Sequence, residues 1–536
     1  MTKQLKKTCI AALTAIVITG ITTMAGYYFS LPAINIHSTF FWRFLIVQVG
    51  IFSTANYLIR RVTGISSKLW KSFAVLIILI LLYWTFRISS SPMFHAKEYA
   101  SVLPVNEETD FQQDIVIDTN KIALMDTSSA AKLGDREIGS LANVVSQYNV
   151  SGSYTQINYQ GDPVKVAPLE YAGFFKWKNN KRVPGYVMVD PVNMSADYCQ
   201  SEDMVYVPSA YFGQNSRRRV QMAYPTKILY EYHFEIDEEG NPYYIYTTCK
   251  QTVGIFGAVT VDGVILLNPC NGETTYYGMG EIPEWIDAVY YGNMLCTQYN
   301  WYGRYKNGYW NSIFAKKDCK KITDQDGMTD YGYLALEDDI WIYTGVTSLN
   351  EDSSNIGFLL ANERTGEARY YAVSGADEFS AMSAAEGEVQ EKGYKASFPS
   401  LISVDGVPTY IMVLKDNSGL VKLYAAVNVE QYNIVTTALT QDECIAKYKK
   451  MLKSGSQIHD VETEKQGKTI SISSLQLISV SGDTYLYVIS TDQEIFRIGP
   501  IGAEGNEQAL LLQKDDVIDI QIQGMQIISW EKREQS

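Results

Sequence analysis

The sequence predicts an α+β protein with three N-terminal transmembrane helices, repeated units of a helix on an antiparallel sheet, and a small C-terminal β-barrel. Three observations predict this fold class. The first 97 residues hold three apolar segments and no acidic residue. A pattern of strand, turn, strand and helix then recurs, most clearly in residues 357–382 (GFLLANERTGEARYYAVSGADEFSAM). Residues 468–530 contain about five short apolar stretches separated by polar turns.

The length and the pattern divide the chain into several domains. At 536 residues it exceeds one core of ordinary size. We expect a membrane anchor over residues 1–97, an α+β domain over 98–200, α+β repeats over 201–452, and a barrel of SH3-like or OB-like type over 468–530.

The three apolar segments are residues 9–29, 40–59 and 73–88. A helix of about 20 residues crosses a hydrocarbon core of roughly 30 Å, so each segment is predicted to span a membrane. Gln48 and Asn56 in the second segment are assigned to helix packing rather than to a conduction path. A signal peptide is the alternative for the first segment, but no A-x-A cleavage site follows it and two more apolar segments do.

The charges around these segments predict an orientation. Three lysines precede the first segment and four basic residues separate the second from the third, whereas residues 30–39 have no Lys or Arg. By the positive-inside rule, the N-terminus is cytoplasmic and the chain after Ser89 is extracytoplasmic. The sequence therefore predicts a multi-pass protein of the cell membrane.

The body of the protein is acidic. Of the 45 basic residues ten lie in the first 97 positions, which leaves 35 against 59 acidic residues, a net charge of −24. Such a charge repels nucleic acid, and no basic recognition helix is evident. We therefore expect no nucleic-acid partner.

Four strand ends occupy equivalent places in the recurring pattern. They are Asp190, Asn268, Asn362 and Asn428, spaced by 78, 94 and 66 residues. Each is followed by a turn and a further extended segment. Helices with acidic first turns are predicted over 283–295, 376–392 and 441–452. The third repeat continues into a three-stranded meander over 394–404, 408–414 and 420–429, on which a helix is expected to pack.

This unit of one helix and three strands resembles the PepSY domain of bacterial secreted and membrane proteins. The resemblance rests on residues 405–410 (DGVPTY) and 362–367 (NERTGE), and it covers about 201–452. The turn glycine is present at Gly272 and Gly366 but absent after Asp190 and Asn428. Asx turns between unrelated strands are the alternative. The resemblance implies a non-catalytic role in extracytoplasmic regulation, including protease inhibition.

The chain as a whole resembles a group of bacterial membrane-anchored proteins to which no activity is assigned. Four short segments carry this resemblance: 146–148 (SQY), 154–157 (YTQI), 234–237 (FEID) and 298–301 (QYNW). It implies a place in the cell envelope and no particular reaction.

Two sets of side chains are candidates for binding. Aromatic residues concentrate between positions 285 and 310, where rings could stack on a sugar or peptide, although core packing is the other use of such residues. Arg217, Arg218 and Arg219 are the densest basic run of the acidic body, and they are either a solvated surface or an anion contact. The aromatic candidates are Trp285, Tyr299, Trp301, Tyr305 and Trp310.

Metal, cofactor and catalytic motifs are missing from the sequence. The seven cysteines show no C-x-x-C spacing, and they are either free or paired in disulfides. The segment 324–330 has an acidic turn, but Ala335 stands where a calcium loop needs glutamate. No G-x-S-x-G, H-E-x-x-H or P-loop is found, so we predict no cofactor, no metal and no catalytic residue.

A carboxylate pair such as Asp338 and Asp339 does not by itself define an active site. We expect a non-catalytic binding or regulatory protein of the cell envelope, with a protein or an envelope polymer as partner. An envelope hydrolase and a subunit of a transport or secretion complex are the alternatives. A deep cleft with two inward carboxylates near residues 285–310 would favour the hydrolase.

Overall fold

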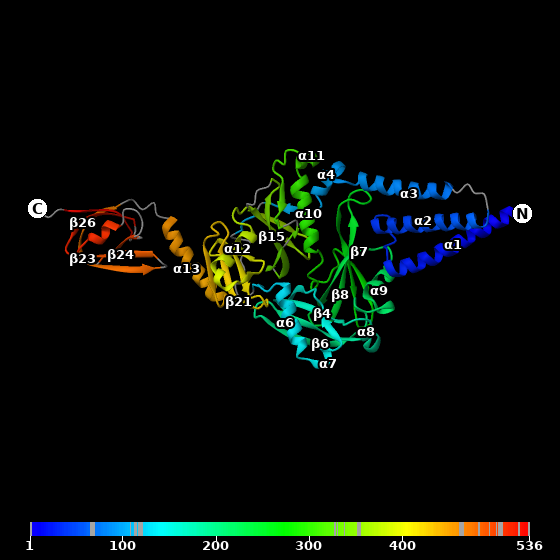
Figure 1. Ribbon diagram of the computed structural model, residues 1–536, viewed down its shortest axis with the longest axis horizontal. Coiled ribbons are helices and arrows are strands. Elements are labelled where there is room, and N and C mark those ends of the chain that lie inside the picture. The colour runs from blue at the N-terminus through cyan, green and yellow to red at the C-terminus, as the bar shows by residue number, and fades with distance from the viewer. Residues whose placement is uncertain are drawn as a thin grey trace. The chain divides into compact units, whose positions relative to one another are not determined.

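The computed structural model describes residues 3–64, 70–107, 109–111, 115, 122–325, 328–329, 331–336, 338–350, 355–459, 466–480, 483–492, 494–499, 501, 507–523 and 526–533. The chain divides into two compact units, Met1–Lys449 and Lys450–Ser536. The first unit holds the N-terminal helices and four large sheets, and the second holds a barrel (Figure 1).

Four helices begin the first unit: α1 (Lys3–Ser30), α2 (Thr39–Val62), α3 (Trp70–Ser89) and α4 (Pro92–Ala100). The helix α2 packs against both α1 and α3 (Figure 1). Gln48 Oε1 of α2 accepts hydrogen bonds from the hydroxyls of Thr22 at 3.1 Å and Thr23 at 3.2 Å on α1. The contacts of Gln48 confirm the packing role predicted for it.

The prediction of three transmembrane helices is wrong. Among the described residues, only the helix Cys9–Ser30 is long and apolar enough to cross a membrane. The apolar part of α3, Phe73–Ser89, qualifies only when it is joined across a 49° bend to Pro92–Ala100, which makes two spans at most. The helix α2 buries three polar side chains and has two arginines in its last turn. These polar and charged residues lower the mean hydropathy of α2 below that of a membrane-spanning helix. The prediction counted the apolar residues of the segment and gave too little weight to the polar ones.

The same antiparallel meander of four strands occurs four times in the described part of the first unit. We name the copies meanders A to D. Meander A comprises β3 (Thr155–Tyr159), β4 (Asp162–Tyr171), β5 (Val183–Asp190) and β6 (Ser195–Met204). Meander B comprises β7 (Ile228–Ile236), β8 (Pro242–Gln251), β9 (Val259–Leu267) and β10 (Thr274–Gly278). Meander C comprises β14 (Gly332–Leu336), β15 (Asp339–Ser348), β16 (Asn355–Asn362) and β17 (Ala368–Tyr371). Meander D comprises β19 (Ser400–Val404), β20 (Val407–Lys415), β21 (Val421–Asn428) and β22 (Val435–Ala438).

Short strands extend three of these sheets. β2 (Tyr148–Val150) pairs with β4, β11 (Lys320–Ile322) with β15, and β18 (Lys395–Ala396) with β20. β1 (Val105–Asn106) pairs in parallel with β17. A separate two-stranded hairpin consists of β12 (Asp324–Gln325) and β13 (Met328–Thr329).

Helices connect and cover the meanders. They are α6 (Thr127–Gly139), α7 (Ala142–Val145), α8 (Phe174–Asn180), η2 (Phe212–Gln214), α9 (Ser216–Ala223), α10 (Gly292–Tyr305), α11 (Tyr309–Ile313), α12 (Glu378–Glu388), η3 (Gln390–Lys392) and α13 (Gln441–His459). The helix α12 packs on β20, β21 and β22 of meander D. The helices predicted over 376–392 and 441–452 are confirmed.

The third strand of each meander ends in a turn closed by an Asp or Asn side chain. Asp190 Oδ1 accepts from the backbone N–H groups of the next turn at 2.8 Å, and Asn268 Oδ1 does so at 2.9 Å. Asn362 Oδ1 accepts two such bonds at 2.8 and 2.9 Å, and Asn428 Oδ1 accepts one at 2.7 Å. The four strand ends identified in the sequence are therefore equivalent in that each accepts backbone N–H groups of the next turn with its side chain. In meanders A to C the acceptor binds the second and third residues after it, whereas in meander D it binds the third, Gln431.

In meanders A to C, the fifth residue of this turn has a left-handed backbone. Gly272 has a φ of +75° and Gly366 a φ of +74°, which glycine adopts without steric cost. Met194 occupies the same position after Asp190 and also has a positive φ of 58°. The turn geometry of meander A is thus kept without glycine, at the cost of some backbone strain.

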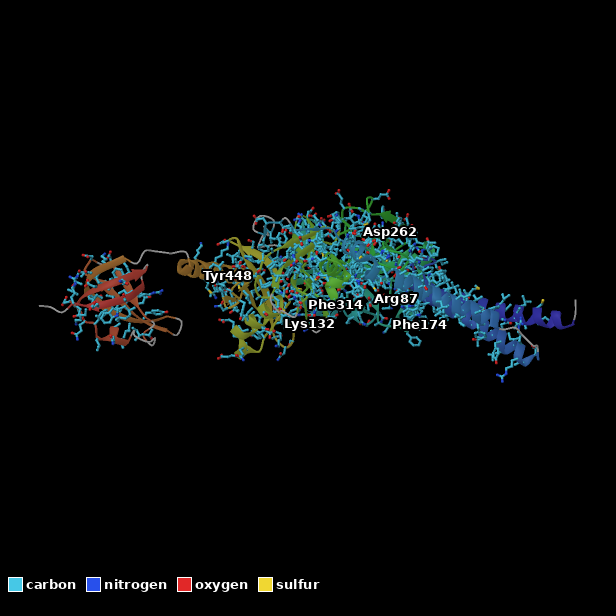
Figure 2. All side chains as sticks on the ribbon, turned by 90° about the horizontal axis from the view of Figure 1, so that it is seen from above. Arg87, Lys132, Phe174, Asp262, Phe314 and Tyr448 are labelled. Carbon is cyan, nitrogen blue, oxygen red and sulfur yellow. The ribbon has the colours of Figure 1, made fainter. Side chains whose placement is uncertain are left out.

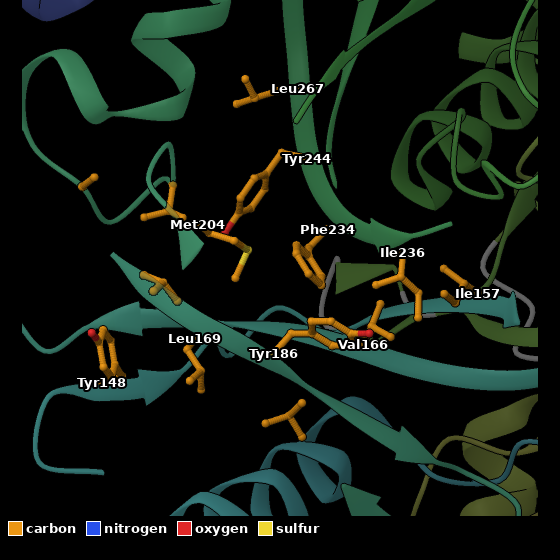
Figure 3. Packing of buried hydrophobic residues seen from close by; sticks show 14 of the residues in the cluster. Tyr148, Ile157, Val166, Leu169, Tyr186, Met204, Phe234, Ile236, Tyr244 and Leu267 are labelled. Carbon is orange, nitrogen blue, oxygen red and sulfur yellow. The ribbon is translucent and has the colours of Figure 1, made fainter. Parts of the chain in front are cut away.

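Two extended hydrophobic cores lie within the sheets of the first unit. One spans meanders A and B, with Leu169, Tyr186, Met204, Phe234 and Tyr244 packed together (Figure 3). The other spans meanders C and D. In the second core, the largest fully buried side chain is Trp341, at 1% exposure. Each core thus unites two neighbouring meanders.

The second unit is a closed barrel over the region where a small barrel is predicted. Its strands are β23 (Gln466–Val480), β24 (Asp483–Ser490), β25 (Ile495–Ile498), β26 (Val517–Gln523) and β27 (Gln526–Lys532), with η4 (Glu507–Leu511) between β25 and β26. They close in the order β23-β24-β25-β27-β26, and Ile472, Val488 and Ile518 fill the interior. Closure of a barrel removes exposed strand edges.

The Asx turn of meander C gives a stability prediction. Replacing the buried Asn362 by alanine leaves the N–H groups of Arg364 and Thr365 without their acceptor and removes the bond to Asp339. We expect the free energy of unfolding to fall by about 1–3 kcal/mol, measured by denaturant unfolding of the full-length protein in detergent. The matched control is Asn179→Ala on α8, where the side chain is exposed and the expected change is within about 0.5 kcal/mol. Equal losses in both variants would show that the side chain of Asn362 does not stabilise the turn.

Candidate functional site

A cleft of about 550 Å³ lies where turns of meanders A, B and C meet. The turn between β3 and β4, the turn between β7 and β8, and the turn between β14 and β15 all contribute. The lining residues are Asn158, Gly161, Glu238, Glu284, Trp285, Asp287, Asp338, Asp339 and Arg364. Five of these are carboxylates and one is a guanidinium, so we call this site the acidic cleft.

Arg364 joins two of the carboxylates. Its Nη2 lies 2.6 Å from Asp287 Oδ1, and its Nε lies 2.6 Å from Asp339 Oδ1. Arg364 is two residues after Asn362, the residue that closes the turn of meander C. Asn362 Nδ2 also donates to Asp339 Oδ2 at 2.7 Å. The turn of meander C therefore positions both the arginine and one of its two partners.

The segment after β10 is held in place by a buried carboxylate. Glu235, fully buried on β7, accepts from the backbone N–H of Asp287 at 3.1 Å and of Ala288 at 3.0 Å. Its Oε1 also lies 2.7 Å from His233 Nε2, and His233 Nδ1 lies 3.0 Å from the Tyr291 hydroxyl. This network fixes the backbone that presents Asp287 to the acidic cleft.

The same segment shows why the helix predicted over 283–295 begins later than predicted. The helix expected over 283–295 begins only at Gly292, at the start of α10. The N–H groups of Asp287 and Ala288 are bound by Glu235, and those of Val289 and Tyr290 donate to the Glu363 carbonyl at 3.0 and 2.6 Å. These tertiary bonds take the donors that a helix would use.

Burial and mutual repulsion raise the pKa of the acids beneath the cleft. Burial, then the nearby charge of Glu235, raises the pKa of Asp287 to about 8. The backbone N–H of Asn158, 2.5 Å from Asp287 Oδ2, and the guanidinium of Arg364 act against this rise. Burial and the charges of Glu235 and Asp287 also raise the pKa of Glu363 well above its usual value.

The structure disperses the aromatic residues that the sequence singles out. Trp285 lines the acidic cleft, with its ring 5.1 Å from that of Tyr243. Tyr299 is fully buried in α10. The rings of Trp301 and Tyr305 pack edge-on against Tyr99 of α4, at 5.0 and 6.3 Å. Tyr299 therefore packs in the core that α10 shares with meander C, whereas Trp301 and Tyr305 belong to the packing between α10 and α4.

The fifth aromatic candidate is at the surface. Trp310 on α11 is 55% exposed and stacks on Phe314 at 5.8 Å; Phe314, labelled in Figure 2, is 77% exposed. Of the five aromatic candidates, only Trp285 therefore lines the acidic cleft.

The three arginines are also separated by the fold. Arg218 Nε donates to the Tyr28 carbonyl of α1 at 3.2 Å, and its guanidinium lies 4.2 Å from the centre of the Tyr28 ring. Arg219 Nε donates to the Gly272 carbonyl at 2.8 Å and so holds the turn between β9 and β10. Arg217 is exposed and lines a different pocket beside Tyr232. Two of the three thus make contacts within the protein.

The sequence gives little indication of the residues that form the acidic cleft. Asp338 and Asp339 stand out as a pair, and Arg364 lies inside the recurring turn, but Asp287 is distant from both along the chain. The link between Arg364 and Asp287 spans 77 residues. Residues that meet from such distances leave no local pattern in a single sequence.

The described residues contain no group of three or more His, Cys, Asp or Glu side chains placed to hold a metal ion. All seven cysteines are free. Of the acidic turn over 324–330, Asp324 pairs with Lys321 at 2.6 Å, whereas residues 326, 327 and 330 lie outside the described residues.

The raised pKa of Asp287 gives a pH prediction. A carboxyl whose folded pKa is raised stabilises the fold below its unfolded pKa, and this contribution is lost as pH rises from the usual value of 3.8 to about 8. We expect the free energy of unfolding to decrease across this range. The decrease should be smaller in Asp287→Asn, whose amide cannot ionise. Denaturant unfolding of the full-length protein at several pH values measures it.

The control for this experiment is Glu284→Gln, which changes an exposed carboxyl at the rim of the same cleft. It should leave the pH dependence of unfolding as it is in the unsubstituted protein. If Asp287→Asn shows the full decrease, Asp287 is already ionised in the folded protein at neutral pH.

No protein-family model matches the chain, and no curated protein matches it significantly. The geometry of the acidic cleft is therefore the basis on which a function is inferred.

Proposed function

We propose that this chain is a membrane-anchored, extracytoplasmic binding protein whose acidic cleft takes a positively charged segment of a partner protein. The observation that carries the proposal is the charge of the cleft, in which one arginine faces five carboxylates. Glu238 and Glu284 are exposed at its rim and are open to a ligand. Asp338 is also exposed there, and its Oδ1 accepts from Asn158 Nδ2 at 2.5 Å. A concave site lined by one sign of charge concentrates ligands of the opposite sign.

Trp285 supports a cationic ligand. Its indole lines the same cleft and is only partly buried. The face of a tryptophan ring attracts lysine and arginine side chains by a cation–π interaction. Carboxylates around such a ring favour a basic peptide over a neutral one.

The anchor is α1, and three observations support an extracytoplasmic body. Lys3, Lys6 and Lys7 precede its apolar stretch, which favours a cytoplasmic N-terminus. Arg218 of the body bonds to Tyr28 near the other end of α1. The body also has exposed aromatic rings on α8 and η2, such as Phe175 at 75% and Phe212 at 54% exposure. Arg218, which contacts α1, also donates to the Phe212 carbonyl. Aromatic rings of this kind prefer a membrane interface.

A non-catalytic role agrees with what the PepSY resemblance implies. Within the cleft, one oxygen of Asp287 and one of Asp339 are already held by Arg364. Acid–base hydrolysis of a glycosidic bond requires carboxyl groups on both sides of the bond. Two carboxylates joined by one guanidinium are better suited to shaping a binding surface.

Binding to the acidic cleft is testable with a fluorescent hexalysine peptide and the full-length protein in detergent. We expect the triple variant Glu238→Gln, Glu284→Gln, Asp338→Asn to bind at least about tenfold more weakly, because the rim loses three charges. Added salt should weaken binding to the unsubstituted protein. Fluorescence anisotropy measures both.

The matched control is Glu239→Gln, which removes an exposed charge from the same turn as Glu238 but not from the cleft lining. It should bind hexalysine almost as tightly as the unsubstituted protein. Equal affinity in the triple variant and the control would show that hexalysine responds to net charge rather than to the acidic cleft.

The orientation has its own test. A tag fused after Ser536 should be labelled by a membrane-impermeant reagent in intact cells stripped of any wall or outer membrane. The reason is that one crossing by α1 with a cytoplasmic N-terminus puts the body, which contacts α1 at Tyr28, on the other side of the membrane. Labelling that appears only after lysis would place the body in the cytoplasm.

A second candidate function is an envelope hydrolase acting on a polymer. The observation that favours it is a cleft with two inward carboxylates beside Trp285, of which Asp287 has a pKa of about 8 and can act as an acid. Release of reducing ends from an amino-sugar polymer, lost in Asp287→Asn while hexalysine binding persists, would establish it. Without such release the binding role stands alone.

A further inference from the structure

A second pocket, of about 290 Å³, shares no lining residue with the acidic cleft. It lies between β3 and β4 of meander A, the segment before α6, and the residues that precede β19. Gln156, Lys165, Tyr331, Tyr333 and Phe398 are among the residues that line it.

Gln156 and Lys165 are directly opposite one another in the antiparallel β3–β4 ladder. Side chains opposite each other in such a ladder project from the same face of the sheet. Both are almost fully buried, at 3% and 2% exposure, and the residues on either side of Lys165 in β4 are apolar and buried. Two long polar side chains are thus placed together at one wall of the pocket.

Among the described residues, neither Gln156 Nε2 nor Lys165 Nζ makes a hydrogen bond or an ion pair. Gln156 Nε2 is buried without a hydrogen-bond acceptor. Lys165 instead makes a cation–π contact with Tyr333, whose ring centre is 5.3 Å from Nζ. Buried amides and ammonium groups are normally paired, so this arrangement is unusual for a site with a purely structural role.

The charged groups around Lys165 do not neutralise it. Asp126 also lines the pocket, but its carboxylate accepts from Lys415 Nζ at 2.5 Å and from the Ser129 N–H at 2.9 Å. Burial lowers the pKa of Lys165 to about 8, and the more distant charges of Asp126 and Glu363 only partly oppose this. The ammonium group of Lys165 therefore has no counterion in the pocket.

We propose that this pocket binds a small organic carboxylate, whose oxygens accept hydrogen bonds from Lys165 Nζ and Gln156 Nε2. The two donors without acceptors match the two oxygens of a carboxylate. The rings of Tyr331, Tyr333 and Phe398 form an apolar wall, which suits a ligand with an aromatic or aliphatic body. The size of the pocket limits the ligand to a small molecule. This proposal does not depend on the function of the acidic cleft.

The experiment measures binding of three probes to the full-length protein in detergent by isothermal titration calorimetry. Benzoate carries a carboxylate on a ring, benzamide is its neutral counterpart, and inorganic phosphate is an oxyanion without an apolar body. We expect benzoate to bind at least about tenfold more tightly than benzamide or phosphate. No binding of benzoate at millimolar concentration, or tighter binding of phosphate, would overturn the proposal.

The variant Lys165→Met tests the residue itself. Replacing a buried unpaired charge by an apolar side chain of similar length is expected to leave the fold intact. Benzoate affinity should fall at least about tenfold in this variant and less in Gln156→Leu, which removes a neutral donor. Unchanged benzoate affinity in Lys165→Met would overturn the assignment.

A measurement on the unsubstituted protein covers the case in which the variants do not fold. Reductive methylation of lysines, read by mass spectrometry, should be slowed at Lys165 by benzoate and not by benzamide. The exposed Lys178 on α8 is the internal control and should react equally with both. Equal labelling of Lys165 with and without benzoate would show that the ligand does not reach it.

Discussion

The acidic cleft depends on one buried carboxylate. Glu235 is fully buried on β7, and its two oxygens accept hydrogen bonds from the backbone of Asp287 and Ala288, 52 and 53 residues further along the chain. A carboxylate without access to water needs such donors, and a loop without helix or strand bonds needs such acceptors. Each therefore satisfies the other. Because the loop is fixed in this way, Asp287 lies within reach of Arg364, and the acids beneath the cleft are close enough to raise one another's pKa.

The hairpin of β3 and β4 contributes to both pockets described above. Side chains two positions apart on a strand project from the same face, so Gln156 and Asn158 follow one another along one side of β3. Asn158, near the turn, donates its backbone N–H to Asp287 in the acidic cleft. Gln156, further from the turn, lies beside Lys165 in the second pocket. Along β3, Asn158 thus lies at the acidic cleft, which has an excess of carboxylates, and Gln156 lies at the second pocket, which has unpaired hydrogen-bond donors. Their opposite electrostatic character makes them suited to ligands of opposite charge.

Repetition of one meander builds the first unit. The Asx turn after the third strand is retained in meanders A to D, although the residue that adopts the left-handed conformation changes from Gly272 and Gly366 to Met194. What differs between copies is what the turns carry. In meander C the turn supplies Asn362, Glu363 and Arg364, which all contribute to the acidic cleft or to the buried acids below it. The turn of meander C thus presents side chains of the acidic cleft on a backbone conformation that it shares with meanders A and B.

The sequence by itself determined the features that depend on neighbouring residues: the α+β class, the four turns at Asp190, Asn268, Asn362 and Asn428, the helices α12 and α13, and the apolar helix of α1. Asx side chains, glycine and local hydrophobic periodicity act over a few positions, so one sequence records them. Only the tertiary structure decided the rest. It showed that the segment around Asp287 is not helical, because Glu235 and Glu363 take its N–H groups. It also brought Asp287, Asp339 and Arg364 together, and it placed Lys165 in a pocket without a counterion. Tyr299 is buried in the core against meander C and Trp301 lies in the contact with α4, instead of in the proposed groove. Those outcomes depend on contacts between segments tens of residues apart, where burial and hydrogen-bond satisfaction override local preference.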